Sequence, residues 1–319
     1  MKTKKAHEHA LPVGYMLHRY RITEAVGGGG FSIVYQAVDT EADRRVVVKE
    51  YLPSDQAKRL PDESVESVSE ETSNTFRQGM KRFFEEAGAL ARVQHPNIVR
   101  VTDFFRENNT VYLVMEHHDG HDLRWYIKRH AGRLSEKFIR TVFPQLLLGL
   151  RALHDESLLH LDIKPANIFL VRPGGKPLLL DFGAAQATFA ADNKRIGPHT
   201  LTMGFAPIEQ HKRGHLGPWT DLYAIGASIY ACMSGKAPPP APRRTEKDTY
   251  RPAVQMFKQH YSRQLLEIVD WCLQINQIER PQNVDSLLDA FSQPASEPVR
   301  HGMGALFARI SRMIPGKKE

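Results

Sequence analysis

The chain has 319 residues, of which 41% are hydrophobic and 25% charged, a balance typical of a globular protein with a large buried core in one domain or two lobes. No apolar run approaches the roughly eighteen residues of a membrane-spanning helix, and the polar start has no secretory signal. The two cysteines, Cys232 and Cys272, lack metal-ligand spacing, so we expect reduced core thiols in a cytoplasmic protein.

The net charge of +7 is concentrated at the two ends of the chain. Residues 1–19 hold four basic and one acidic residue, and residues 294–319 hold five basic and two acidic residues, which leaves the body near +1. A nucleic-acid-binding domain more often carries its charge on the fold itself. We therefore expect solvated ends and no nucleic-acid partner.

The first predicted element is a glycine-rich hairpin that follows a mobile leader, residues 1–18. Residues 20–26 and 33–38 are predicted strands on either side of the glycines. Such a backbone can bring N–H groups close to phosphate oxygens, although a plain flexible hairpin explains this segment equally well on its own. The hairpin comprises Val26, Gly27, Gly28, Gly29, Gly30, Phe31, Ser32, Ile33 and Val34.

A third predicted strand, residues 44–50, carries Lys49 after a run of valines. Residues 53–74 are rich in Ser, Glu and Asp, and we expect a surface loop or short hairpin there. A predicted helix over residues 75–93 carries Glu86. The further predicted strands are at about 99–105 and 110–116.

Helical sequence dominates the second half of the chain. Residues 135–156 are predicted to be a helix with Ser135 as N-cap, and later helices are expected near 262–275 and 284–292. After a proline-containing linker, residues 299–319 form an amphipathic basic stretch. Contact with an anionic membrane surface or a partner is one interpretation of this tail, and docking on the protein's own surface or disorder is another.

The central motif is His160-Leu161-Asp162-Ile163-Lys164-Pro165-Ala166-Asn167, with Asp181-Phe182-Gly183 after it. Either motif alone could arise by chance, but their order and spacing, with Lys49 upstream, resemble the catalytic loop and metal-binding turn of serine/threonine protein kinases. The run Lys49-Glu50-Tyr51-Leu52-Pro53 resembles the bacterial, eukaryotic-like branch of that family. The resemblance covers roughly residues 20–292.

The resemblance implies a role for each motif residue. Asp162 would be the general base, or at least would orient the attacking hydroxyl, and Lys164 would neutralise charge on the transferring phosphoryl group. Thr202 matches the threonine that bridges these two residues. Asn167 and Asp181 would hold Mg²⁺, with Mn²⁺ as the alternative metal.

The resemblance also implies how ATP would bind. Lys49 would contact the α- and β-phosphates and would need a carboxylate partner, for which Glu86 fits better than its neighbour. The hinge, the segment between the two lobes, would contact adenine. The histidines of the hinge would form a metal site only if further ligands completed it. The implied nucleotide-binding residues are those of the hairpin together with Lys49, Glu86, Glu116 and His118 of the hinge, and Asp122 for the ribose.

The sequence departs from the family pattern at two positions. Ser32 stands where the glycine-rich loop usually has its third glycine, which is a mild change. Leu161 stands where the family usually has an arginine that receives an activation-loop phosphate, and leucine cannot pair with phosphate. We also expect a buried ion pair between Glu209 and Arg280, and an Asp221 carboxylate bonded to the catalytic-loop backbone.

The sequence therefore predicts an α+β, bilobal kinase-like fold over residues 19–293, with an N-lobe at 19–116, a C-lobe at 120–293 and a tail at 294–319. The predicted activity is transfer of the γ-phosphoryl group of ATP to serine or threonine of a protein substrate, or of the chain itself. A pseudokinase that binds nucleotide or a partner is the main alternative, and Thr202 disfavours a small-molecule kinase. We expect a monomer or transient dimer.

Overall fold

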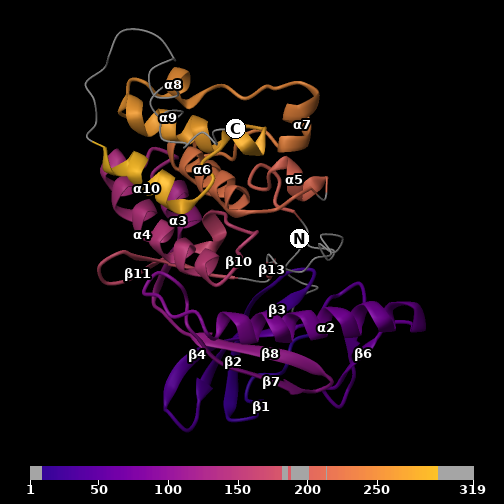
Figure 1. Cartoon of the computed structure of the whole chain (residues 1–319). Helices are drawn as coiled ribbons and strands as arrows, with labels where there is room; N and C mark the ends of the chain where they lie inside the picture. Colours follow the sequence, from indigo (N-terminus) through magenta and orange to yellow (C-terminus); the bar gives the residue numbers. More distant parts are fainter. Residues whose placement is uncertain (1–8, 182–185, 188–200, 213, 294–319) are drawn as a thin grey trace.

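The computed structural model describes residues 9–181, 186–187, 201–212 and 214–293, which form two lobes (Figure 1). The smaller lobe is an antiparallel sheet with one long helix, and the larger lobe is mostly helical. The chain passes between them after residue 116. The predicted α+β, bilobal architecture is confirmed.

The N-lobe sheet has six strands in the order β1-β2-β3-β4-β8-β7, and all neighbours are antiparallel. Burial alternates along β3, which is the pattern of a strand with one face on a core. The central strands β4 and β8 are buried on both faces for most of their length. The strands are β1 (Met16–Leu17), β2 (Tyr20–Gly28), β3 (Ser32–Asp39), β4 (Arg44–Tyr51), β7 (Val101–Glu107) and β8 (Thr110–Glu116).

Residues 9–18 pack on this sheet, so the expectation of a mobile leader is wrong for this part of the chain. Strand β1 pairs with β2, and Leu11 and Leu17 are buried in the N-lobe core. The backbone N–H of Leu11 donates to the Tyr35 hydroxyl at 3.1 Å. An apolar residue outside any periodic pattern can thus be buried by residues that are distant in the sequence. Residues 1–8 lie outside the described part of the chain.

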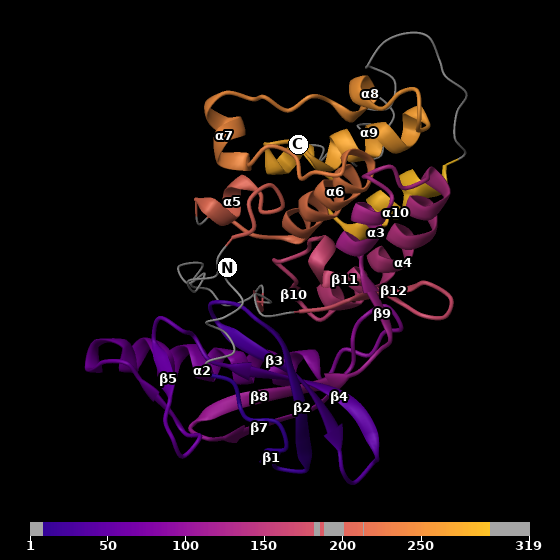
Figure 2. The ribbon, with the colours of Figure 1, turned by 180° about the vertical axis from the view of Figure 1, so that it is seen from behind.

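Of the two expectations for the segment between β4 and the N-lobe helix, a surface loop or a short hairpin, the structure shows the hairpin, made of β5 (Ala57–Arg59) and β6 (Val65–Ser67). Helix α2 (Glu70–Leu90) follows and begins earlier than the predicted residue 75. Its start is set by Ser69, whose hydroxyl accepts from the Thr72 N–H, while Thr72 reaches back to the Ser69 N–H. Figure 2 shows α2 running along the sheet.

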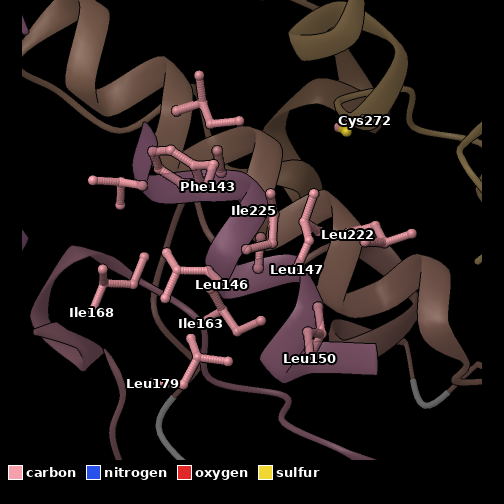
Figure 3. Close-up of a cluster of buried hydrophobic side chains, with 14 of the residues drawn as sticks. Phe143, Leu146, Leu147, Leu150, Ile163, Ile168, Leu179, Leu222, Ile225 and Cys272 are labelled. Carbon is pink, nitrogen blue, oxygen red and sulfur yellow. The ribbon is translucent and has the colours of Figure 1, made fainter. Parts of the chain in front are cut away.

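The C-lobe is built around two buried helices, α4 (Glu136–Asp155) and α6 (Pro218–Ser234). The predicted helix is present, with Ser135 as its N-cap as expected, and its buried side chains include Val142, Leu146, Leu150 and Leu153. Leu146, Leu147 and Leu150 of α4 and Leu222 of α6 belong to one continuous core (Figure 3). The remaining C-lobe helices are α3 (Leu123–Arg129), α5 (Ile208–His211), α7 (Ala241–Glu246), α8 (Ala253–Met256), α9 (Arg263–Cys272) and α10 (Val284–Ser292).

Short strands hold the catalytic segment between the lobes. Strand β11 lies between β9 and β12, while β10 pairs with β13. Their bounds are β9 (Gly120–Asp122), β10 (Leu158–Leu159), β11 (Ile168–Val171), β12 (Lys176–Leu179) and β13 (Gln186–Ala187), with the short helices η1 (Pro165–Asn167) and η2 (Gln277–Glu279). No helix in the described ranges has both the length and the apolar character to cross a bilayer.

Candidate active site

Asp162 lies at the centre of a hydrogen-bond network between the lobes. Lys164 Nζ donates to both of its carboxylate oxygens, at 2.9 and 2.7 Å, and to Thr202 Oγ1 at 3.0 Å. The Thr202 hydroxyl in turn donates to Asp162 Oδ1 at 3.2 Å, which is the expected bridging position. Asn167 Nδ2 donates to the backbone oxygen and to Oδ2 of Asp162, at 2.8 and 3.0 Å. The network fixes the orientation of a carboxylate that is only partly exposed.

Asp221, in the first turn of α6, fixes the backbone of the loop that carries Asp162. The buried Asp221 carboxylate accepts from the N–H groups of His160 and Leu161, at 2.9 and 2.8 Å, as predicted. It also contacts His154 Nε2 at 2.9 Å. Burial alone would raise the pKa of Asp221, but these bonds and charges outweigh it and the pKa is lowered. Leu161 has a φ of 60°, a strained value for a branched residue that this anchoring maintains.

Lys49 is the second charged centre and forms an ion pair with Asp181. Its side chain is nearly buried, which alone would lower the pKa. The Asp181 carboxylate outweighs the burial, with Glu86 contributing, so the pKa of Lys49 is raised and the amine is cationic. Asp181 has a φ of 58°, a second left-handed residue in this segment. Phe182 and Gly183 lie outside the described residues.

These centres border a cavity of about 360 Å³ between the sheet and the C-lobe. Its volume is within the range of small-molecule sites. The structure places eight predicted site residues on its walls, drawn from the hairpin, strand β4, the hinge and the two motifs. They are Val26, Gly27, Val34, Lys49, Glu116, His118, Asn167 and Asp181.

Several predicted nucleotide-binding residues do not line this cavity. Ile33 points into the N-lobe core and is 3% exposed, because strand alternation turns it away from Val34. Asp122 accepts from the Trp125 N–H at 3.0 Å as N-cap of α3 and forms an ion pair with Arg124. Also outside the walls are Gly28, Gly29, Gly30, Phe31, Ser32 and Glu86.

The cavity also has walls that the sequence reasoning missed. Val47 lines it because it is two residues before Lys49 on the same face of β4, a signal that strand alternation contains. Ala166 and Phe169, close to Asn167, form the opposite wall, and Arg124 stands at its edge. Apolar lining residues thus come from both the N-lobe sheet and the C-lobe, which suits a site for a flat ring.

Leu161, at the position where the family usually has an arginine, is surrounded by apolar side chains. Leu161 is 8% exposed and packs in a small cluster with Leu159 and Leu216. A phosphate would find no cation at this residue. The predicted buried ion pair is also present: the Arg280 guanidinium donates to both Glu209 oxygens, at 2.7 and 3.1 Å.

The donor set of this site fits a triphosphate and a divalent cation. The positions that a Cβ would take at Gly27, Gly29 and Gly30 have no atom within 4 Å, so phosphate oxygens can approach the backbone. Asn167 uses Nδ2 for Asp162, which leaves its oxygen as the amide atom suited to a hard cation. Asp181 supplies a carboxylate at the same cavity.

Comparison with known proteins agrees with this geometry. The family model described as "Protein kinase domain" matches residues 20–291. Serine/threonine-protein kinase PknA of Mycobacterium tuberculosis is 32% identical over 225 residues, which cover 69% of this chain and 48% of that protein. Serine/threonine-protein kinase B of Synechocystis is 28% identical over 293 residues, covering 88% of this chain and 47% of that protein. The chain thus spans about half the length of these curated relatives.

Solved structures show the same likeness. A structure titled "PpkA-294 apo form" matches with a TM-score of 0.78 and 35% identity, and covers 89% of this chain and 100% of its own. The kinase domain of Mycobacterium tuberculosis PknI matches with a TM-score of 0.65 and 19% identity, covers 88% of this chain and 98% of its own, and supports the fold alone. The chain belongs to the protein kinase family.

Proposed function

We propose that this chain is a serine/threonine protein kinase that transfers the γ-phosphoryl group of ATP to a hydroxyl of a protein, including itself. The observation that carries the proposal is the network of Asp162, Lys164 and Thr202 beside a cavity that also holds Lys49 and Asp181. The relatives named as bacterial serine/threonine-protein kinases support the assignment. Use of ATP fits the cytoplasmic location that we expect.

In this proposal each residue of the site has a defined role. Asp162 accepts a hydrogen bond from the substrate hydroxyl and takes its proton as the new P–O bond forms, while the bond between the γ-phosphorus and the β,γ-bridging oxygen of ATP breaks and ADP leaves. Lys164 holds that carboxylate in place and places positive charge beside the transferred group, while Lys49 binds the phosphates. Asn167 and Asp181 are the residues that would hold Mg²⁺, which neutralises phosphate charge when bound.

The lack of a phosphate-binding arginine gives the proposal a regulatory part. Leu161 sits among apolar side chains, so phosphorylation within residues 184–202 has no cation at this position to bind. We therefore expect activity without phosphorylation of that segment. Nearly all of the segment lies outside the described residues.

The proposal is tested with purified protein, Mg²⁺ and γ-labelled ATP, with and without dephosphorylated protein substrates. We expect label on serine or threonine that falls by about a hundredfold to ten-thousandfold in Asp162→Asn, since the orienting base is lost. Asp155→Asn, which neutralises an exposed carboxylate at the end of α4, is the matched control and keeps wild-type labelling. If ATP raises the melting temperature but no label appears, the chain is a nucleotide-binding pseudokinase and the proposal fails.

A further inference from the structure

A second and larger cavity adjoins the Asp162 network on the C-lobe side. It has a volume of about 710 Å³ and lies between α3, the catalytic loop and the end of α6. Lys164 and Thr202 form one of its walls, so a chain lying in it would pass beside the residues that we assign to phosphoryl transfer. Ala166 and Arg124 are shared with the nucleotide cavity. We call this cavity the α3–α6 groove.

The charged side chains among the described residues that line the α3–α6 groove are all positive. Its lining residues include Arg124, Lys128, Lys164 and Lys236, and none of them is Asp or Glu. Two of the four already have an acidic partner, because Lys164 bonds Asp162 and Arg124 pairs with Asp122. No ion pair joins Lys128 or Lys236 to a carboxylate of the described residues, and both are exposed. The groove therefore has two ammonium groups available to a ligand.

Among the groove's lining residues in the described part of the chain, none carries a carboxylate that would attract a cationic ligand. Small residues, Ala166 and Ala231, stand where a longer side chain would reach into it. Ile127 and Phe205 give it an apolar part that can bury the stem of a long side chain. Its chemistry thus favours carboxylates at the edge and aliphatic groups inside.

The walls of the groove are held rigidly against each other. Gly132 after α3 and Gly235 at the end of α6 have φ values of 69° and 75° and meet backbone to backbone. A Cβ on Gly132 would lie 2.1 Å from the Gly235 nitrogen. Leu134 N also donates to Cys232 O at 3.2 Å. The spacing between Lys128 on one wall and Lys236 on the other is therefore set by the fold.

We infer that the α3–α6 groove selects protein substrates with acidic side chains close to the phosphorylated serine or threonine. The inference rests on the proposed function and specifies its substrate class. Lys128 and Lys236 are the specificity-determining residues, and they act by pairing with substrate carboxylates. Arg124 is a weaker contributor because Asp122 partly neutralises it. Like charges on a substrate would be repelled at the same positions.

The inference is tested with three peptides that share one central threonine and alanine spacers, and that carry Glu, Gln or Lys on both sides. Two exposed ammonium–carboxylate pairs correspond to about a two- to thirtyfold gain in kcat/KM for the Glu peptide over the Gln peptide. The Lys peptide is expected to be poorer than the Gln peptide. Equal rates for the three peptides, or a preference for Lys, would overturn the inference and leave the proposed function standing.

Charge reversal assigns the selectivity to the groove. In the Lys128→Glu/Lys236→Glu variant, the ratio of kcat/KM for the Glu peptide to that for the Lys peptide should fall at least tenfold. The ratio is measured within one preparation, so a smaller folded fraction cancels. Lys258→Glu, which changes an exposed lysine that lines neither cavity, should keep the wild-type ratio.

Autophosphorylation distinguishes a failure of the inference about acidic substrates from a failure of the proposed kinase function. A protein that labels itself but transfers to none of the peptides overturns the inference alone, because the groove should accept the Glu peptide. A protein that labels neither itself nor any peptide overturns the proposed function, and the inference with it. A wild-type ratio in the Lys128→Glu/Lys236→Glu variant also overturns the inference.

Discussion

Glu50 and Arg59 form the buried ion pair whose loss is the most informative test of the N-lobe. Glu50 follows Lys49 in β4, is fully buried, and accepts from Tyr35 Oη at 2.6 Å, Tyr112 Oη at 2.7 Å and Arg59 Nη2 at 2.5 Å. The Arg59 side chain, 5% exposed, also donates to the His9 backbone oxygen at 2.7 Å. Arg59→Met therefore leaves a buried carboxylate without its cation and removes one of the contacts that hold the β5–β6 hairpin on the lobe.

The size of the effect follows from what remains around Glu50. Removing one partner of a buried pair typically destabilises by about 3–5 kcal/mol. Two tyrosine hydroxyls still donate to Glu50, so we expect the lower end, about 3 kcal/mol for Arg59→Met. Adding Glu50→Gln removes the stranded charge and should restore about 2 kcal/mol of that loss.

Urea unfolding, with linear extrapolation of the free energy of unfolding to water, measures these changes. The matched control is Lys58→Met on the same hairpin, because Lys58 pairs with Glu66 at 3.1 Å while both side chains are 48% exposed. Its loss should be below about 1 kcal/mol. The reasoning is refuted if Arg59→Met loses less than about 1 kcal/mol, or if the double variant is no more stable than the single one.

Three further predictions concern the C-lobe. Because the pKa of Asp221 is lowered in the folded state, its contribution to stability is present above about pH 4 and is lost as the pH falls through that folded pKa. The difference in free energy of unfolding between wild type and Asp221→Asn, measured by urea unfolding, should therefore shrink between pH 6 and pH 3. Gly132→Ala should lower the melting temperature far more than Gly174→Ala, since both have positive φ but a Cβ would collide only at Gly132. Phosphatase treatment that removes phosphate from residues 184–202, verified by mass spectrometry, should leave the initial rate of labelling unchanged, and a lost rate would contradict the proposal about Leu161.

The parts of the site that could be predicted from sequence are those where local spacing decides the geometry. Asp162, Lys164 and Asn167 lie within one short loop, so their order in the chain already places them together. Thr202 is distant in sequence, and its position came from the resemblance to a family. The strand that carries Lys49 was also predictable, because a β-branched run is the pattern of a buried strand.

The parts that could not be predicted depend on which partner a side chain finds in three dimensions. The position of Asp122 suggests a ribose ligand, but its carboxylate is occupied by the Trp125 N–H and by Arg124. Leu11 shows no periodic pattern, yet the sheet buries it through contacts with residues far along the chain. The start of α2 was placed too late because its capping partner is Thr72 rather than the usual Glu or Gln.

Buried and exposed charged residues of this chain affect different measurable properties, namely stability and peptide preference. Asp221 and Glu50 fix the backbone around the catalytic loop and the Lys49 strand, so changing them alters stability and rate together. Lys128 and Lys236 are exposed, and changing their charge alters the free energy of unfolding by about 0.5 kcal/mol or less. If the α3–α6 groove selects acidic substrates, its charge-reversal variant should therefore change peptide preference at an unchanged melting temperature. A variant that lost stability and preference in parallel would show instead that these lysines support the fold.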